Sequence, residues 1–259
     1  MNDSLYIAAT GMQAQQLSLD TIANNLVNVN TPGFKRSRVN FNELMHVGTE
    51  QNVNSLAGAS TGRALGIGIN VDSVARDFSP GALTQTNLPL DVSINGSGFL
   101  EVTLADGSHG YTRGGTMQIT KDSFLATSAG YALKSAIHIP ANITALTISQ
   151  DGKVSVQTSA GGQTTEIGQL ELVNFANPGG LKMAGSGVYV PTDASGQAMF
   201  GKPGSHGMGT IAQGTLESSN VSMVDEMVTL MIAQKAYELS SKVAQASDEM
   251  MSMTNNLRK

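Results

Sequence analysis

The sequence contains no cysteine and no tryptophan, and it has few aromatic or charged residues. Among its 259 residues, 5% are aromatic and 14% are charged. Because cysteine is absent, disulfides and thiolate sites are excluded. The 29 glycines and the scarce aromatics favour many turns and modest cores over one large aromatic core.

An excess of positive charge and long apolar runs are missing as well. The formal net charge is −5 at pH 7, so no general basic face is available to neutralise nucleic-acid phosphates. No apolar run approaches the roughly 20 residues of a membrane-spanning helix. The Met1-Asn2-Asp3 start lacks a basic region, and no apolar signal core follows. We therefore expect a chain that binds no nucleic acid, spans no membrane and is exported, if at all, without a cleaved signal peptide.

The sequence also lacks a catalytic constellation. Gly58–Gly62 fits the G-x-S-x-G string of serine hydrolases, but it lies in a Gly/Ser/Ala-rich stretch and not at a strand-to-helix elbow. The four histidines have no partners at metal-ligand spacing. Gly204–Gly209 is glycine-rich but lacks the lysine of a phosphate-binding loop. We predict that the chain is not an enzyme and has no catalytic residue, no metal and no cofactor.

The first thirty residues predict a long amphipathic helix. Apolar and small residues recur at alternating spacings of three and four, which is the a/d pattern of a coiled-coil seam. The seam consists of Leu5, Ala8, Met12, Gln15, Leu19, Ile22, Leu26 and Val29. A helix from Ser4 to Asn30 would be roughly 40 Å long at about 1.5 Å per residue, and Pro32-Gly33 would end it. Such a narrow stripe on so long a helix requires a partner helix.

The middle of the chain changes to period two. Alternating apolar residues between Ile67 and Leu216, with hairpin signals at Asp106-Gly107 and Asp151-Gly152, predict an antiparallel β region. The stretch 46–66 is rich in Gly, Ser, Ala, Thr and Asn, which indicates an extended loop. The basic cluster Lys35–Arg38 is either a solvated turn or a polar contact with a neighbouring subunit.

A second long helix is predicted after Ser218. Its first stripe consists of Ile232, Ala236, Leu239, Val243, Ala246, Met250, Met253 and Leu257. Its second stripe consists of Met223, Leu230, Tyr237, Ala244 and Met251. The two stripes are about 200° apart on the helix at about 100° per residue. One can pack on the N-terminal helix of the same chain, and the other is covered either by neighbouring copies or by the β domain. We favour neighbouring copies, because methionine tolerates several packings.

These patterns predict an α+β fold. Long N- and C-terminal helices, within 1–35 and 217–259, would pack as a coiled-coil layer. A linker and extended loop would occupy 36–75, and an inserted, mainly antiparallel β domain would occupy 76–216.

Several segments resemble the bacterial flagellar basal-body rod and hook protein family. They are Ala23–Lys35, Gly96–Phe99, Asp106-Gly107, Tyr111–Gly115, Leu216–Val221, Glu226–Val228 and Gln234–Glu238. These segments follow one another in the order expected for the family, and together they span nearly the whole chain. One departure is Lys121–Ala126, where the family has an Asp/Asn-Gly turn and this chain has Ser123 in place of the glycine.

Within this family, the chain length and the 46–66 insertion resemble the distal-rod members most, with a proximal rod or hook subunit as the alternative. The resemblance implies a structural subunit that polymerises helically into a rigid hollow drive shaft and transmits torque from motor to hook. The helices would line an inner tube and the β domain would form the outer layer. It further implies type III export and a rod that crosses the periplasm to the outer membrane.

The implied partners are other copies of the chain, the proximal rod proteins, the hook protein, the P- and L-ring proteins and a rod cap with muramidase activity. The expected assembly interface consists of Leu5, Met12, Leu19, Ile22, Asn25, Leu26, Val29, Phe34, Met223, Leu230, Ile232, Tyr237, Leu239, Val243, Met250 and Leu257. A different class, a carbohydrate-binding or hydrolytic β protein with helical tails, is the remaining hypothesis.

Overall fold

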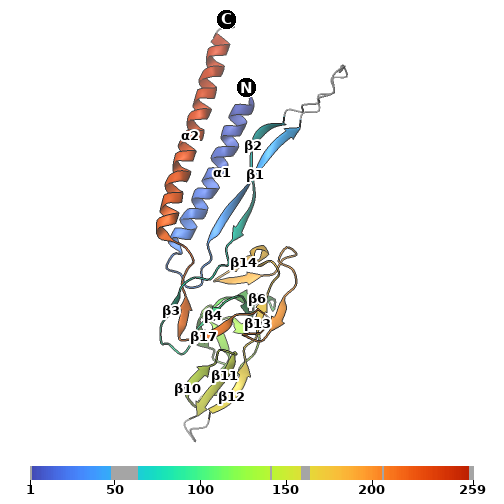
Figure 1. The fold of residues 1–259 in the computed structure, drawn as a ribbon, viewed down its shortest axis with the longest axis vertical. Helices are drawn as coiled ribbons and strands as arrows, with labels where there is room; N and C mark the ends of the chain where they lie inside the picture. Colours follow the sequence, from blue (N-terminus) through green and yellow to red (C-terminus); the bar gives the residue numbers. More distant parts are fainter. Residues whose placement is uncertain (1, 48–63, 141, 159–163, 206, 257–259) are drawn as a thin grey trace. The chain divides into compact units, whose positions relative to one another are not determined.

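The computed structural model describes residues 2–47, 64–140, 142–158, 164–205 and 207–256 (Figure 1). The chain divides into two compact units. The helical unit comprises Met1–Val27, Ser37–Ala75 and Ser222–Lys259. The β unit comprises Asn28–Arg36 and Arg76–Val221. The coarse prediction is confirmed: an N-terminal and a C-terminal helix flank a mainly antiparallel β domain.

The helical unit contains both helices. Helix α1 (Asn2–Val27) lies beside α2 (Met223–Asn256), and its other side packs on strand β1 (Ser37–Val47), which pairs with β2 (Ala64–Arg76) (Figure 1). Over the described residues, neither helix is both long enough and apolar enough to cross a membrane.

The prediction of a linker over 36–75 is wrong for the part of this stretch that the structure describes. Residues 37–47 and 64–76 are strands. Val39 and Phe41, and then Ile67, Ile69 and Val71, provide the alternation and the β-branched or aromatic side chains that favour a strand. The alternation from Ile67 already belongs to the predicted β region, whereas no strand was predicted over 37–47. Residues 48–63 lie outside the described residues.

The helix ends differ slightly from the predicted ones. Helix α1 ends at Val27, before the expected Asn30, because Asn28 to Pro32 favours turns: the Asn28 carbonyl accepts the Thr31 N–H at 3.1 Å. Helix α2 begins at Met223, and the Ser222 carbonyl accepts the Glu226 N–H at 3.0 Å. Asp225 and Glu226 lie in its first turn, where negatively charged carboxylates interact favourably with the positive end of the helix dipole.

Antiparallel strands make up most of the β unit. Their bounds are β3 (Leu83–Gln85), β4 (Asp91–Asn95), β5 (Phe99–Thr103), β6 (His109–Thr112), β7 (Gly114–Ile119), β8 (Leu125–Thr127), β9 (Ala132–Leu133), β10 (Ile143–Ile148), β11 (Lys153–Thr158), β12 (Thr164–Gln169), β13 (Leu172–Asn174), β14 (Lys182–Gly185), β15 (Val188–Val190), β16 (Met199–Gly201), β17 (Thr210–Gln213) and β18 (Thr215–Glu217). A short 3-10 helix, η1, spans Pro178–Gly180.

Over the described residues these strands form three sheets. The largest has eleven strands, most of them in the order β14-β15-β6-β5-β9-β8-β7-β4-β17. Strands β10-β11-β12 form a second sheet, and β18 pairs with β3 in the third. The main core includes Val92, Ile94, Val102 and Leu172. A smaller core groups five of the chain's twelve aromatic rings, with Phe99, Tyr111 and Tyr189 buried in it.

The predicted Asp-Gly turns are confirmed. Asp106-Gly107 joins β5 to β6, and Asp151-Gly152 joins β10 to β11. Gly107 and Gly152 have φ values of 81° and 79°, a left-handed conformation that glycine adopts without a steric penalty. At the departure from the family pattern, Ser123 takes the same kind of conformation, with φ of 62°. The hairpin between β7 and β8 is therefore formed with serine in the position of the glycine.

Candidate assembly site

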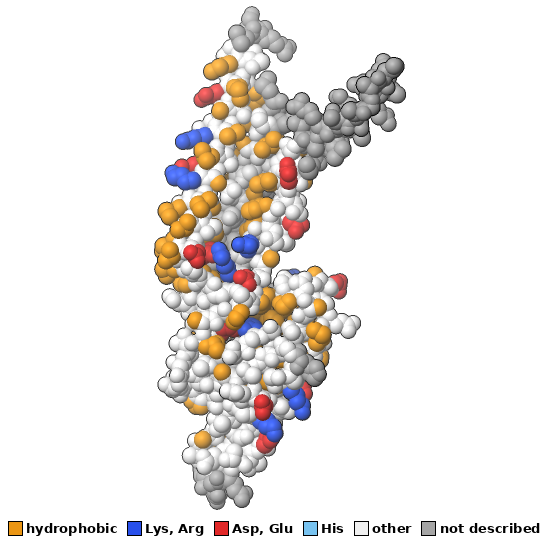
Figure 2. All heavy atoms as spheres, in the orientation of Figure 1, with side chains coloured by type: hydrophobic (Ala, Val, Ile, Leu, Met, Phe, Trp, Pro, Cys, Tyr) orange, Lys and Arg blue, Asp and Glu red, His pale blue; other side chains and the backbone are white. Residues whose placement is uncertain are grey.

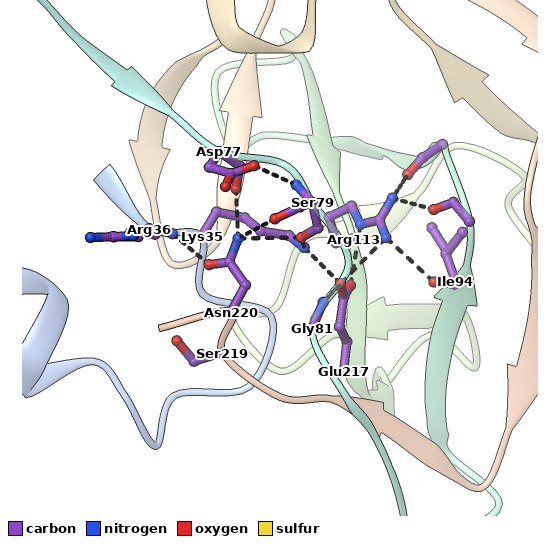
Figure 3. A network of polar contacts seen from close by, with 12 residues as sticks. Lys35, Arg36, Asp77, Ser79, Gly81, Ile94, Arg113, Glu217, Ser219 and Asn220 are labelled. Carbon is purple, nitrogen blue, oxygen red and sulfur yellow. Dashed lines mark hydrogen bonds and ion pairs between the residues drawn. The ribbon is translucent and has the colours of Figure 1, made fainter. Parts of the chain in front are cut away.

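The β unit buries a polar network at the junction of residues 33–36, 77–81 and 217–220 (Figure 3). We call Lys35, Arg113 and Glu217, together with the groups they bond, the junction network. The Lys35 side chain has no solvent exposure. Its ammonium donates to Glu217 Oε1 at 2.6 Å and to the Ser79 carbonyl at 2.7 Å. A lysine so deeply buried requires a paired anion, because an unpaired buried charge is strongly unfavourable.

Arg113 is the second cation of the junction network. Its Nε donates to Glu217 Oε2 at 3.2 Å, and its Nη1 donates to the carbonyls of Gly96 and Gly98 at 2.8 and 3.0 Å. Gly96 and Gly98 have φ values of 109° and 138°, which residues with side chains rarely adopt. The two glycines thus permit the loop conformation that presents these carbonyls to the guanidinium.

The Glu217 carboxylate forms ion pairs with both Lys35 and Arg113. It also accepts the Gly81 N–H at 2.9 Å, while its backbone carbonyl accepts the Gly33 N–H at 2.7 Å. Burial alone would raise the pKa of Glu217, but the charges of Arg113 and Lys35 outweigh burial and hold that pKa below its usual value. Burial also lowers the pKa of Lys35, against the opposing effect of Glu217.

Asn220 completes the junction through its amide group. Its Oδ1 accepts the Arg36 N–H at 2.7 Å, and its Nδ2 donates to the Asp77 carbonyl at 2.9 Å (Figure 3). The Asp77 carboxylate accepts the Ser79 N–H at 2.9 Å, and this bond lowers the pKa of Asp77. Three segments that resemble the flagellar family, those carrying Lys35, Arg113 and Glu217, therefore meet at one place in the β unit.

For Lys35, both alternatives that the sequence left open are wrong. It is neither solvated nor free to contact a neighbouring subunit, because its partner Glu217 lies in the same unit. The pairing spans 182 residues of sequence, and no local pattern could have indicated it. Arg38, by contrast, is exposed.

In the helical unit, a buried asparagine on α1 forms hydrogen bonds with both β1 and α2. Asn25 on α1 is 1% exposed. Its Oδ1 accepts the Ser37 N–H at 2.9 Å, and its Nδ2 donates to the Ser37 carbonyl at 2.9 Å and to Glu226 Oε2 at 3.3 Å. One side chain on α1 therefore bonds both the first residue of β1 and the first turn of α2.

The contact between α1 and α2 uses small side chains. The inward positions of α2 repeat every seven residues at Glu226, Ala233, Ser240 and Ser247. A Cβ on Gly11 of α1 would lie 3.5 Å from Ser240 Oγ, so the two helices approach closely there. The sequence left open which stripe of α2 faces α1. The small residues at 233, 240 and 247 are the signal that could have decided it.

The expected interface residues fall into four groups. Ile22, Asn25 and Phe34 are buried. Leu5, Met12, Leu19, Leu26, Val29 and Leu230 are partly buried. Met223, Ile232, Tyr237, Leu239, Val243 and Met250 are exposed. Leu257 lies outside the described residues.

The exposed residues of the first stripe belong to a wider apolar face of α2, which is oriented away from α1. We call it the α2 apolar surface, and Figure 2 shows hydrophobic side chains gathered along this helix. It consists of Met223, Val224, Met227, Val228, Met231, Ile232, Leu239, Val243, Met250 and Met253, which are 44–71% exposed. These positions span about 200° of the helix circumference at about 100° per residue. In the first three turns the arc is apolar throughout, and from Gln234 onward exposed polar residues such as Lys235, Glu238 and Lys242 share it. An apolar face as wide as that of the first three turns is typical of a helix that packs on more than one neighbour.

Three family profiles match the chain, and all are flagellar. Residues 5–35 match the flagella basal body rod protein family. Residues 93–156 match the flagellar hook protein FlgE/F/G D1 domain. Residues 212–257 match the C-terminal part of the flagellar basal body rod FlgEFG proteins. The first and last matches contain Asn25, Lys35 and Glu217, and the middle match contains Arg113.

Full-length relatives carry the same description. The flagellar basal-body rod protein FlgG of Borreliella burgdorferi is 43% identical over the whole of both chains. FlgG of Caulobacter vibrioides is 39% identical over 98% of this chain and 99% of its own. FlgG of Bacillus subtilis is 36% identical over 99% of each. These matches confirm the resemblance and the prediction of a structural protein that is not an enzyme. The chain belongs to the flagellar basal-body rod protein family.

Proposed function

We propose that the chain is a subunit of the distal rod, and that copies polymerise helically through the α2 apolar surface into a rigid hollow shaft that transmits torque from motor to hook. The observation that carries this proposal is the α2 apolar surface itself. Its first three turns expose Met223, Val224, Met227, Val228, Met231 and Ile232.

Burial of these side chains supplies the driving force for polymerisation. Fully burying one side chain of this size stabilises an assembly by about 1.5–3 kcal/mol. Apolar patches of this extent on a soluble subunit mark interaction sites. Because small residues bring α1 and α2 close together, the bulky residues of α2 remain available to other copies.

The proposed arrangement has two layers. The helices pack as a coiled-coil layer that forms the inner tube, and the β unit forms the outer layer. In the seam of α1, Leu5, Met12, Leu19 and Leu26 are only partly buried within one copy, which supports further contacts with neighbouring helices. We also propose that the 46–66 insertion stiffens the rod through contacts between subunits.

The degree of similarity supports a distal-rod subunit over the alternative of a proximal rod or hook subunit. The FlgG relatives are 36–43% identical along the whole chain. The flagellar hook-basal body complex protein FlhP of Bacillus subtilis is 27% identical over 98% of this chain. The proposed neighbours are the proximal rod proteins, the hook protein, the P- and L-ring proteins and the rod cap. The proposed location is the rod where it crosses the periplasm to the outer membrane, reached by type III export without a cleaved signal peptide.

Charge placed on the α2 apolar surface tests the proposal. Ile232→Asp and Leu239→Asp, each more than 60% exposed, should leave the full chain folded but abolish basal-body assembly and motility in cells that depend on it. Gln197→Asp is the control, because it places the same residue at an exposed polar position of the β unit, outside the α2 apolar surface. Wild-type motility and normal rods in both Ile232→Asp and Leu239→Asp cells would refute the proposed interface.

A further inference from the structure

Methionine is concentrated on the α2 apolar surface. Six of the thirteen methionines lie on α2, and five of these six are 44–63% exposed. Because the chain has no cysteine, thioethers are its only sulfur atoms. Any oxidant that reacts with sulfur therefore acts on methionine.

The exposed methionines form a row at the start of the helix. Met223, Met227 and Met231 are spaced by four residues, which places them one above another on the same side. Their exposed fractions are 44%, 47% and 56%. We call these three residues the methionine row.

We propose that the methionine row is an oxidation site, at which a peroxide converts the free subunit into a form that cannot polymerise. The reaction needs only hydrogen peroxide. The thioether sulfur attacks one peroxide oxygen, an S–O bond forms as the O–O bond breaks, and the departing hydroxide takes up a proton to leave as water. Sulfur is oxidised to the sulfoxide and the peroxide is reduced. A methionine sulfoxide reductase reverses the change.

The consequence for assembly rests on the proposed function of the α2 apolar surface. A sulfoxide turns a flexible apolar side chain into a polar one, and this disrupts methionine-rich interfaces. In the contact between copies, the three sulfoxide groups would be buried without hydrogen-bond partners. Because the burial of an unpaired polar group is unfavourable, this would weaken the contact. In a finished polymer the same contact would exclude the oxidant, so oxidation would act on subunits before assembly.

The chain contains two natural controls. Met117 in the β unit is 3% exposed and should resist oxidation in the folded chain. Met199 on β16 is 51% exposed, as much as the methionine row, but lies outside the α2 apolar surface. Oxidation of Met199 should therefore leave polymerisation unchanged.

The first experiment measures the site directly. The purified full chain and isolated basal bodies are treated with hydrogen peroxide, and sulfoxide formation is followed at each methionine by peptide mass spectrometry. We expect oxidation of Met223, Met227 and Met231 well before Met117 in the free chain, and strong protection of the row in basal bodies. Equal oxidation of the row in both samples would overturn the proposal.

The second experiment measures the effect on assembly in cells. Glutamine is used to imitate the polarity of the sulfoxide: the triple variant Met223→Gln/Met227→Gln/Met231→Gln should lose rods and motility, whereas Met199→Gln should keep both. The triple Met→Leu variant, which conserves volume and polarity, should assemble normally. Normal assembly of the triple glutamine variant would refute the oxidation proposal. If Ile232→Asp or Leu239→Asp still abolished assembly, the proposed function would stand; if neither did, both would fall.

Discussion

Glu217 is the residue on which the junction network depends. It is 3% exposed and forms ion pairs with two buried cations, Lys35 and Arg113. Removing one partner of a buried ion pair lowers the folding stability by more than the intact pair contributes to it, because the other charge remains buried without a counterion. Here the loss of one carboxylate leaves two such charges.

We expect Glu217→Gln to lower the free energy of unfolding by about 3–5 kcal/mol, the range typical of a broken buried pair. Urea denaturation of the full chain, followed by circular dichroism, measures the change. Glu166→Gln is the matched control: its pair with Lys153 is 51% exposed on each side, so it should change stability by no more than about 1 kcal/mol. Similar small losses for the two variants would contradict the role of Glu217.

The same carboxylate predicts a pH dependence. The pKa of Glu217 is lowered from a usual value of 4.5, so the unfolded chain binds its proton at a higher pH than the folded chain does. Stability from this group is thus fully present above pH 4.5 and is lost as pH falls through the lowered pKa. The difference in unfolding free energy between wild type and Glu217→Gln should shrink on acidification below pH 4.5. A constant difference over that range would contradict the assignment.

The residue scale also shows where sequence reasoning stops. Lys35 stood in an apparently solvated basic cluster, and its burial follows only from Glu217 and Arg113, which are remote in sequence. Asn25 was named as an interface residue, but its bonds to Ser37 and Glu226 could not be inferred from periodicity. Ser123 was recognised as a departure from the family, and its left-handed conformation became evident only from the backbone.

Among the elements, the β7–β8 hairpin has a measurable strain. Ser123 has φ of 62°, and in that conformation the contact of Cβ with the backbone destabilises the folded chain by roughly 1–2 kcal/mol. A glycine at this position would avoid that steric cost, but its backbone would lose more conformational entropy on folding. We therefore expect Ser123→Gly to raise the free energy of unfolding by roughly 0.5–1 kcal/mol. Thermal denaturation measures it, and a lowered midpoint would contradict the turn geometry.

The two sides of α2 should differ in their response to added volume. Ala233 is 5% exposed, on the side of α2 that faces α1, so Ala233→Leu should destabilise the full chain by about 1–3 kcal/mol through overpacking. Ala246 is exposed, and Ala246→Leu, which adds the same volume, should change stability by less than about 0.5 kcal/mol. Helix unfolding followed by circular dichroism compares the two variants. A larger loss for Ala246→Leu would reverse the assigned orientation of α2.

At the level of elements, periodicity predicted both helices and most of the β region. The Asp-Gly turns are predicted because Asp106-Gly107 and Asp151-Gly152 stand between alternating runs. The alternation that starts at Ile67 lies in β2 and belongs to the predicted β region, whereas no pattern predicted β1. The orientation of α2 was left open because two apolar stripes run along it, and only the small residues at 233, 240 and 247 mark the side that packs on α1.

For the whole molecule, the central claim is that neighbouring copies bury the α2 apolar surface, which a single subunit leaves exposed. Alone, it leaves about 180° of the first three turns of α2 apolar and exposed, at about 100° per residue. The β unit and its junction network hold residues 33–36 and 217–220 together, so the chain segments that precede α2 and follow α1 are fixed within one unit. A polymer of such subunits would bury the bulky side of α2 between copies.

A cryo-EM reconstruction of the rod in isolated basal bodies containing this chain tests the claim most directly. It should show the α2 apolar surface, from Met223 to Met253, packed against helices of neighbouring copies in the inner layer, with the β units outside. A map in which these side chains face solvent or the lumen, while the β units make the contacts between copies, would contradict it.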